Sequence, residues 1–219
     1  AAAKKLGLTE PKVADVWRHA QARLLKRPVV VVAPKPFDAK RTVVHYDIET
    51  YEGAVYLHGA ICEKDGVSTE RQFFAAKPAD ERAAWHEFLE WLAGLESPLV
   101  WTWTTFENGH VERLWSKHGG SARGWKNLKE GLADLKEWTK RHYALPVTSY
   151  SIKLVAPALG FSWDAKDAGG LNSESWYGEW VRTGEEKLRR KILRYNLDDV
   201  RAMAVVWGRL GEPDPEPGD

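Results

Sequence analysis

Two carboxylates, Asp47 and Glu49, are the first residues of this chain whose types and spacing could do chemistry. They lie in residues 43–50, VVHYDIET, where apolar and polar residues alternate as in a β-strand. Side chains two apart in a strand point to the same face, so the two acids should lie side by side. Adjacent carboxylates repel each other, and hard divalent cations such as Mg2+ prefer oxygen ligands. An isolated D-x-E is more often a solvated strand face, so a metal site requires further acids.

A second candidate pair lies in RYNLDDV, where Tyr195 precedes Asp199 by four residues. In a helix this spacing places both side chains on one face, so Asp199 could bind a metal while Tyr195 positions a water. Asp198 points about 100° away around the helix, and only one of the two aspartates can share the face of Tyr195. The alternative is a surface helix with two solvated aspartates.

Two further acids could complete such a site. Glu107, in TTFENGHVERL, follows an apolar strand and opens a helix, where the helix dipole favours a carboxylate. An ordinary first-turn acid explains Glu107 equally well. Asp134, in LADLKEW, lies beside apolar residues, and a helix cap or a hydrogen-bonding support explains it better than a metal ligand. Which of the two completes the site stays open.

The composition is that of an ordinary globular protein, with 43% hydrophobic and 29% charged residues among 219. A net charge of +1 means that any nucleic-acid binding must depend on a local patch and on metal. The single cysteine, Cys62, excludes a disulfide framework and a multi-cysteine zinc site, and it suits a reducing compartment. No apolar run approaches the length of a membrane span, so we expect a cytoplasmic protein without a membrane partner.

The elements that must position these acids form an α/β pattern. The strand that carries Asp47 and Glu49 should bury Val44, Tyr46 and Ile48 on its other face. It begins an antiparallel meander that is followed by further strands and helices, which together indicate a mixed sheet flanked by helices. The expected strands are residues 43–50, 54–62, 72–76 and 99–105. The expected helices are residues 9–27, 79–93, 107–118, 149–159 and 185–210, with an amphipathic stretch over 125–143 and a loop over 164–175.

We expect three parts in the chain. Residues 1–38 should be a helical leader and proline-rich linker from an upstream module, and residues 39–211 the main domain. Residues 212–219, acidic and rich in proline, should be a disordered tail.

The chain has three motifs in order: D-x-E on a strand, an acid where a strand passes into a helix, and Y-x-x-x-D on a last helix. Together they resemble the tyrosine-bearing subtype of the DEDD superfamily of 3′–5′ exonucleases, which have the ribonuclease H-like fold. The sequence is more similar still to the predicted ribonuclease H-like nuclease domains at the C-terminus of RecB-type nuclease fusion proteins. The similarity covers about residues 43–210 and is carried by HYDIET, VYLHGAI, WTTFENGHVERL, LPVTSYSIKLVAPALGFSW, SWYGEW and RYNLDDVRAM. The second motif usually has aspartate where this chain has Glu107, and the longer side chain could shift the metal preference from Mg2+ toward Mn2+.

The resemblance implies a 3′–5′ exonuclease that hydrolyses phosphodiester bonds of DNA or RNA, single strands preferred. We expect a role in DNA repair, and defence or CRISPR-type processing stay open as alternatives. The resemblance also implies two divalent metal ions, Mg2+ or Mn2+. Asp47 would contact both ions, Glu49 and Asp199 the ion on the nucleophile side, and Glu107 the other, while Tyr195 would position the attacking water. An upstream RecB-like nuclease or helicase module would be a partner.

Aromatic and basic residues beside the motifs could contact the substrate strand. The candidates are Phe106, His110, Tyr150 and Lys153, with Trp103 and Trp176. A core or surface position explains each of them alone better than a substrate contact does, and Lys153 is the best candidate of the set. Two rival functions stay open. One is a weakly active or inactive nucleic-acid-binding scaffold within a larger nuclease or helicase assembly, and the other is a structure-specific endonuclease.

Overall fold

The computed structural model describes residues 9–38, 40–163 and 170–211, with side chains from residue 173 in the last range. The chain forms two compact units. The larger, here called the sheet unit, comprises residues 38–135 and 163–204. The smaller comprises residues 1–37, 136–162 and 205–219. The domain boundaries expected from the sequence therefore remain predictions, and the tail over 212–219 lies outside the described residues.

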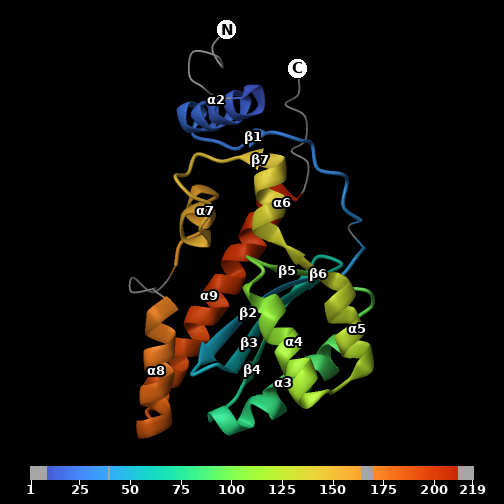
Figure 1. The fold of residues 1–219 in the computed structure, drawn as a ribbon, viewed down its shortest axis with the longest axis vertical. Coiled ribbons are helices and arrows are strands. Elements are labelled where there is room, and N and C mark those ends of the chain that lie inside the picture. The colour runs from blue at the N-terminus through green and yellow to red at the C-terminus, as the bar shows by residue number, and fades with distance from the viewer. Residues whose placement is uncertain (1–8, 39, 164–169, 212–219) are drawn as a thin grey trace. The chain divides into compact units, whose positions relative to one another are not determined.

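A mixed five-stranded sheet forms the centre of the sheet unit, in the order β4-β3-β2-β5-β6 (Figure 1). The bounds are β2 Val43–Tyr51, β3 Ala54–Lys64, β4 Val67–Phe74, β5 Leu99–Thr102 and β6 Leu132–Asp134. Strands β2, β3 and β4 form an antiparallel meander, whereas β5 runs parallel to β2, and β6 parallel to β5. This confirms the expected α/β class with a mixed sheet.

Helices cover both faces of this sheet. The sheet unit contains η1 Pro78–Asp80, α3 Glu81–Ala93, α4 Phe106–His118, α5 Ala122–Gly131, α8 Gly170–Thr183 and most of α9 Glu186–Leu210. Val44, Tyr46 and Ile48 of β2 pack in one core cluster with Phe88 and other residues of α3, as expected. A second cluster joins β3 to α8 and α9 through Tyr56, Leu57, Tyr177 and Ile192. Because side chains alternate along a strand, Asp47 and Glu49 face away from α3.

In the middle of the chain, the observed elements differ from the expected ones at three places. Strand β4 starts at Val67 rather than residue 72, because its first residues are exposed on an edge strand and lack hydrophobic alternation. Strand β5 ends at Thr102, and a turn follows in which the Thr104 hydroxyl accepts the Phe106 N–H at 3.1 Å. Within 125–143 the chain forms α5, the three-residue strand β6 and α6 Leu135–His142. A strand this short shows no readable period.

The expected loop over 164–175 is wrong from Gly170 onward, where α8 begins, and its first six residues lie outside the described part of the chain. The polar start of this helix, GLNSES, conceals its helical period. Helix α9, by contrast, closely matches the long helix expected over 185–210.

The smaller unit contains α2 Glu10–Leu25, β1 Val29–Val30, β7 Tyr143–Ala144 and α7 Ile152–Ala158, with most of α6. Strand β1 pairs with β7, and the Arg23 guanidinium donates to the Val147 carbonyl at 3.0 Å. The expected leader therefore packs against later parts of the chain. Helix α7 begins after Ser151, two residues beyond the serine with which the expected helix started.

Among the described helices, none is long and apolar enough to cross a membrane.

Candidate metal centre

Three carboxylates converge in the sheet unit. Asp47 and Glu49 from β2 and Asp199 from α9 each offer an oxygen, and these oxygens all lie within 4.8 Å of one another. Glu49 is buried, while Asp47 and Asp199 are half-buried. Asp198 instead lies 3.3 Å from the Arg201 guanidinium. Strand alternation and helical spacing thus bring together the three acids that the sequence singles out.

A neutral side chain donates a hydrogen bond to each of these carboxylates. Asn196 Nδ2 donates to Asp47 at 2.9 Å, and Trp163 Nε1 donates to Asp199 at 2.8 Å. The hydroxyl of Ser173, on α8, donates to Glu49. Such donors orient the carboxylates without neutralising their charge. None of the three was predicted from the sequence, because they come from separate segments and follow no local pattern.

The position of Asn196 depends on a glycine. In the sheet, Asp47 pairs with Gly59 and Gly59 with Gln72, so the three residues form one row. Asn196 is fully buried over this row, and its Oδ1 accepts a hydrogen bond from Gln72 Nε2 at 3.1 Å. A Cβ built on Gly59 would lie only 1.8 Å from Asn196 Oδ1. A glycine within a strand often marks such a close approach, and this signal could have been read from VYLHGAI.

The electrostatics of the cluster favour a bound cation. Burial raises the pKa of Asp47 well above its usual value, and the charges of Glu49, Glu107 and Asp199 raise it further, against the hydrogen bond from Asn196. The neighbouring carboxylates thus make ionisation of Asp47 more costly. A cation among them would reverse this effect.

Tyr195 lies one helical turn before Asp199 and is buried. Burial, together with the charges of Asp199, Glu49 and Asp47, raises the pKa of its hydroxyl above its usual value. The hydroxyl therefore stays protonated at neutral pH and is a hydrogen-bond donor, not a base. The rings of Trp176 and Tyr195 meet edge to face, with centroids 6.0 Å apart.

Glu107 lies in the first turn of α4 and is buried, with 3% of its surface exposed. It is outside the three-acid group, although its charge raises the pKa of Asp47. Burial raises the pKa of Glu107 itself to about 7, a backbone hydrogen bond opposes the rise, and Asp134 adds to it. Within the described residues, its Oε2 has no hydrogen-bond partner. Asp134, at the end of β6, is close enough to influence Glu107 and remains the alternative.

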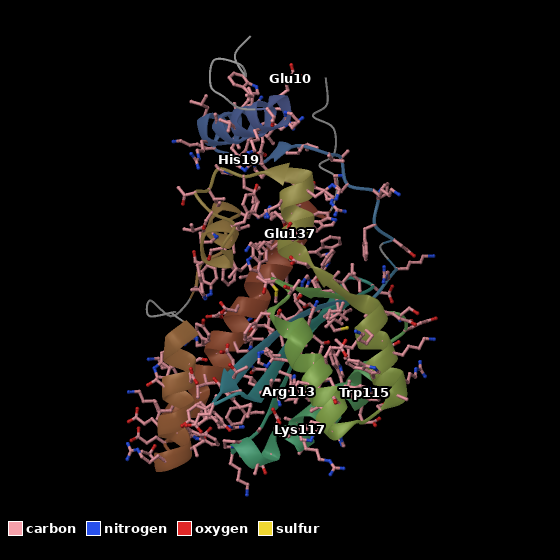
Figure 2. All side chains as sticks on the ribbon, viewed as in Figure 1. Glu10, His19, Arg113, Trp115, Lys117 and Glu137 are labelled. Atoms are coloured by element: carbon pink, nitrogen blue, oxygen red, sulfur yellow. The ribbon has the colours of Figure 1, made fainter. Side chains whose placement is uncertain are left out.

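A second buried acid, Glu81, fixes the backbone behind the centre. The β2–β3 pairing shifts between Glu49 and Thr50, and the nearby Val55 N–H donates to Glu81 Oε1 at 2.9 Å. Three basic residues of α4 bind the same carboxylate: Arg113 at 2.7 Å and Lys117 at 2.9 Å, both labelled in Figure 2, and His118 at 3.0 Å. Glu81 thus joins the irregular hairpin beside Glu49 to the helix that carries Glu107.

The residues expected to contact substrate fall in both units. Phe106, next to Glu107, is 55% exposed, and its ring lies 4.6 Å from that of His110. Trp103 is buried. Tyr150 and Lys153 belong to the smaller unit, where the Tyr150 hydroxyl donates to the Tyr143 carbonyl at 2.7 Å. A substrate role for Phe106, His110, Tyr150 and Lys153 remains a prediction.

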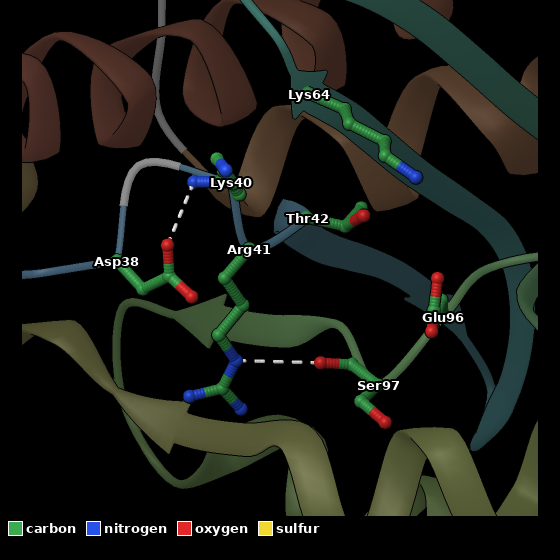
Figure 3. Close-up of a pocket in the computed structure, with 7 residues that line it drawn as sticks. All are labelled: Asp38, Lys40, Arg41, Thr42, Lys64, Glu96 and Ser97. Atoms are coloured by element: carbon green, nitrogen blue, oxygen red, sulfur yellow. Dashed lines mark hydrogen bonds between the residues drawn. The ribbon is translucent and has the colours of Figure 1, made fainter.

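A shallow pocket of about 410 Å³ lies at the other end of β2, near Thr42 (Figure 3). It is lined by charges of both signs, with Lys40, Arg41 and Lys64 opposing Asp38 and Glu96. Thr42 is five residues from Asp47, which corresponds to about 16 Å along a strand. The pocket is therefore separate from the acid cluster.

The fold and this cluster define an α/β protein with a mixed sheet and a candidate acidic metal-binding centre. A family model described as the RNase H superfamily matches residues 44–210, and the chain belongs to this superfamily. Ribonuclease H-like nucleases use divalent metals and act on nucleic acids. Comparison with curated proteins and with solved structures found no match. The superfamily expected from the motifs is thus confirmed, whereas the DEDD subtype and the RecB-type context remain predictions.

Proposed function

We propose that this protein is a metal-dependent 3′–5′ exonuclease that hydrolyses phosphodiester bonds of DNA or RNA and prefers single strands. The observation that carries the proposal is the meeting of Asp47, Glu49 and Asp199 within 4.8 Å in a chain of the RNase H superfamily. Tyr195, one turn before Asp199, supports the tyrosine-bearing exonuclease subtype in particular.

The donor set suits Mg2+ or Mn2+, because it consists of carboxylate oxygens. Asp47, Glu49 and Asp199 would hold one ion. Asp47 with Glu107 or Asp134 would hold a second. The buried Oε2 of Glu107, which has no hydrogen-bond partner among the described residues, supports that role. Two such ions, when bound, supply a nucleophile at neutral pH and stabilise the charge on the leaving oxygen.

The side chains of this chain supply orientation. Asn196 and Trp163 hold the Asp47 and Asp199 carboxylates by hydrogen bonds, and Ser173 holds that of Glu49. The protonated Tyr195 hydroxyl, which hydrogen-bonds with Asp199, would position the attacking water. Proton removal from that water falls to a group other than Tyr195, whose raised pKa keeps it protonated.

A time course on a 5′-labelled single strand with Mg2+ or Mn2+ tests the proposal. The wild type should give a ladder that shortens from the 3′ end. Asp47→Asn and Asp199→Asn should give none, while Asp65→Asn, in the exposed β3–β4 turn, is the matched control and should cut normally. Full activity in Asp47→Asn would refute the site assignment.

A nucleic-acid-binding module with weak or no activity is the second candidate, favoured by the position of Glu107 outside the three-acid group. Binding of the labelled strand in Ca2+, without cleavage in Mg2+ or Mn2+, would support this candidate. Cleavage of a circular strand would instead indicate an endonuclease. The RecB-like upstream partner, the cytoplasmic location and the role in DNA repair are proposals that rest on the sequence resemblance and composition.

A further inference from the structure

One lysine continues the row of functional residues on α9. Lys191, Tyr195 and Asp199 follow one another at intervals of four residues. In a helix this spacing places the three side chains on one face, each one turn from the next. Lys191 therefore lies on the helix face that contributes to the acid cluster, one turn beyond Tyr195.

An aromatic ring holds the Lys191 ammonium in place. Its Nζ lies 3.9 Å from the centroid of the Trp176 ring, a cation–π contact. The same Trp176 ring contacts Tyr195 at 6.0 Å between centroids. The ammonium is thus no farther from the Tyr195 ring than these two distances together. Trp176 also packs against the core cluster around Tyr56 and Tyr177, so its position is fixed by α8 and the sheet.

Two of the other basic residues of α9 form ion pairs with acids. Arg189 binds Glu186 at 2.9 Å, and Arg201 binds Glu70 at 2.7 Å. Within the described residues, Lys191 has no carboxylate partner, and its contact is with the Trp176 ring. The half-buried Lys191, on the helix face that carries Tyr195 and Asp199, is thus left to bind an anion from outside.

We propose that Lys191 binds a backbone phosphate of the substrate strand, next to the phosphodiester that is cleaved, and that Trp176 holds it there. The inference rests on the proposed nuclease function, since it takes the anion to be a nucleic-acid phosphate. A polyanionic strand that approaches several carboxylates requires positive charge near them, and a lysine supplies a compact point charge. Because the ammonium already rests on an aromatic face, it loses less conformational freedom on binding than a solvated lysine would.

The test is the salt dependence of binding in Ca2+, measured by fluorescence anisotropy on labelled oligothymidylate and oligouridylate. Each phosphate contact contributes about 0.7 to the slope of log affinity against log salt for a single strand. Lys191→Gln should reduce the slope by about that amount and weaken binding roughly tenfold at low salt. Lys191→Arg should keep the slope. Lys126→Gln, an exposed lysine of α5, makes the same charge change and should leave binding and cleavage unchanged.

The outcomes separate this inference from the function on which it rests. If the wild type binds and cleaves but Lys191→Gln keeps the full slope, Lys191 is only a packing residue and the inference is overturned, while the nuclease proposal stands. A Lys191→Gln protein that melts earlier but keeps the slope leads to the same conclusion. If the wild type neither binds nor cleaves either strand, both proposals fail.

Discussion

Replacing Gly59 by alanine should disturb the centre from a position that carries no functional group. Gly59 faces the buried amide of Asn196, and an added Cβ would lie 1.8 Å from Asn196 Oδ1 and 2.7 Å from its Cγ. No real contact is that short, so Asn196 or the helix that carries it must move. Asn196 is fully buried and bonded to both Asp47 and Gln72, so any shift of its amide disturbs these hydrogen bonds.

The cost follows from the bonds that must break. A hydrogen bond to a charged group contributes about 1.5–3 kcal/mol and a neutral one about 1 kcal/mol. Forcing a methyl group into a packed site adds about 1–3 kcal/mol. Alanine stabilises the fold by about 0.5–1 kcal/mol relative to glycine, because it is less flexible in the unfolded chain. The net loss should be about 2.5–6.5 kcal/mol, against a total stability of about 5–15 kcal/mol for a domain.

Urea unfolding would measure this loss, with Gly109→Ala as the matched control. A Cβ at Gly109 meets nothing within 4 Å, and the residue lies inside α4, where alanine gains about 1 kcal/mol over glycine. The same substitution should thus have opposite signs at the two glycines. Gly59→Ala should also weaken Mn2+ binding, seen as a smaller rise of Tm with Mn2+, because Asp199 follows Asn196 by three residues on α9.

A double-mutant cycle identifies the contact responsible. In an Asn196→Ala background the amide is gone, and Gly59→Ala should then cost much less than in the wild type. Equal costs in both backgrounds would show that Asn196 does not fill the space over Gly59, and the explanation of its position would be wrong.

Three further predictions concern ionisable groups. The pKa of Glu107 is about 7 in the folded protein, against 4.5 ordinarily, so the folded state binds this proton more tightly than the unfolded state. The stability of the metal-free protein should therefore fall as the pH rises from about 4.5 to 7. The loss is at most about 3 kcal/mol and should vanish in Glu107→Gln, as urea unfolding at several pH values would show. Asp47→Asn should raise the Tm of the metal-free protein and abolish its increase with Mn2+, because it removes one repelling charge and one ligand; an unchanged response to Mn2+ would contradict the metal assignment. Glu81→Gln should cost about 1.5–3 kcal/mol, because it removes the charge that accepts the hydrogen bonds of the partly exposed Arg113 and Lys117; calorimetry that finds no loss would refute the structural role of Glu81.

The acid cluster could be predicted because its positions follow from local periods. Alternation in β2 determines that Asp47 and Glu49 share a face, and the four-residue spacing in α9 joins Tyr195 to Asp199. Both elements are long and strongly patterned. Such patterns depend only on residues within one element, so they can be read without knowing its tertiary contacts.

The groups that support the cluster could not be predicted in this way. Ser173 and Asn196 bond to β2 across separations of 124 and 149 residues, which only the folded chain brings together. Strand β6 was missed for a related reason, since three residues between two helices carry no period of their own. Asp134, expected as a helix cap or a hydrogen-bonding support, ends this strand and directly precedes α6, so that expectation remains a prediction.

The two acid sites of the sheet unit, Glu81 and the cluster around Asp47, differ in the charge of the groups that bind them. The carboxylate of Glu81 accepts hydrogen bonds from the basic residues Arg113, His118 and Lys117. Burial alone would raise its pKa, but these hydrogen bonds hold the pKa well below the usual range. Asp47 accepts a hydrogen bond from the neutral amide of Asn196, and its pKa is raised. The first arrangement is complete in the protein alone and stabilises the fold. The second is oriented but remains electrostatically costly, and a divalent cation would lower this cost by the free energy of its binding. Metal should therefore stabilise the protein more at pH 8 than at pH 5, where protons already relieve the repulsion, and equal stabilisation at both would contradict a carboxylate site.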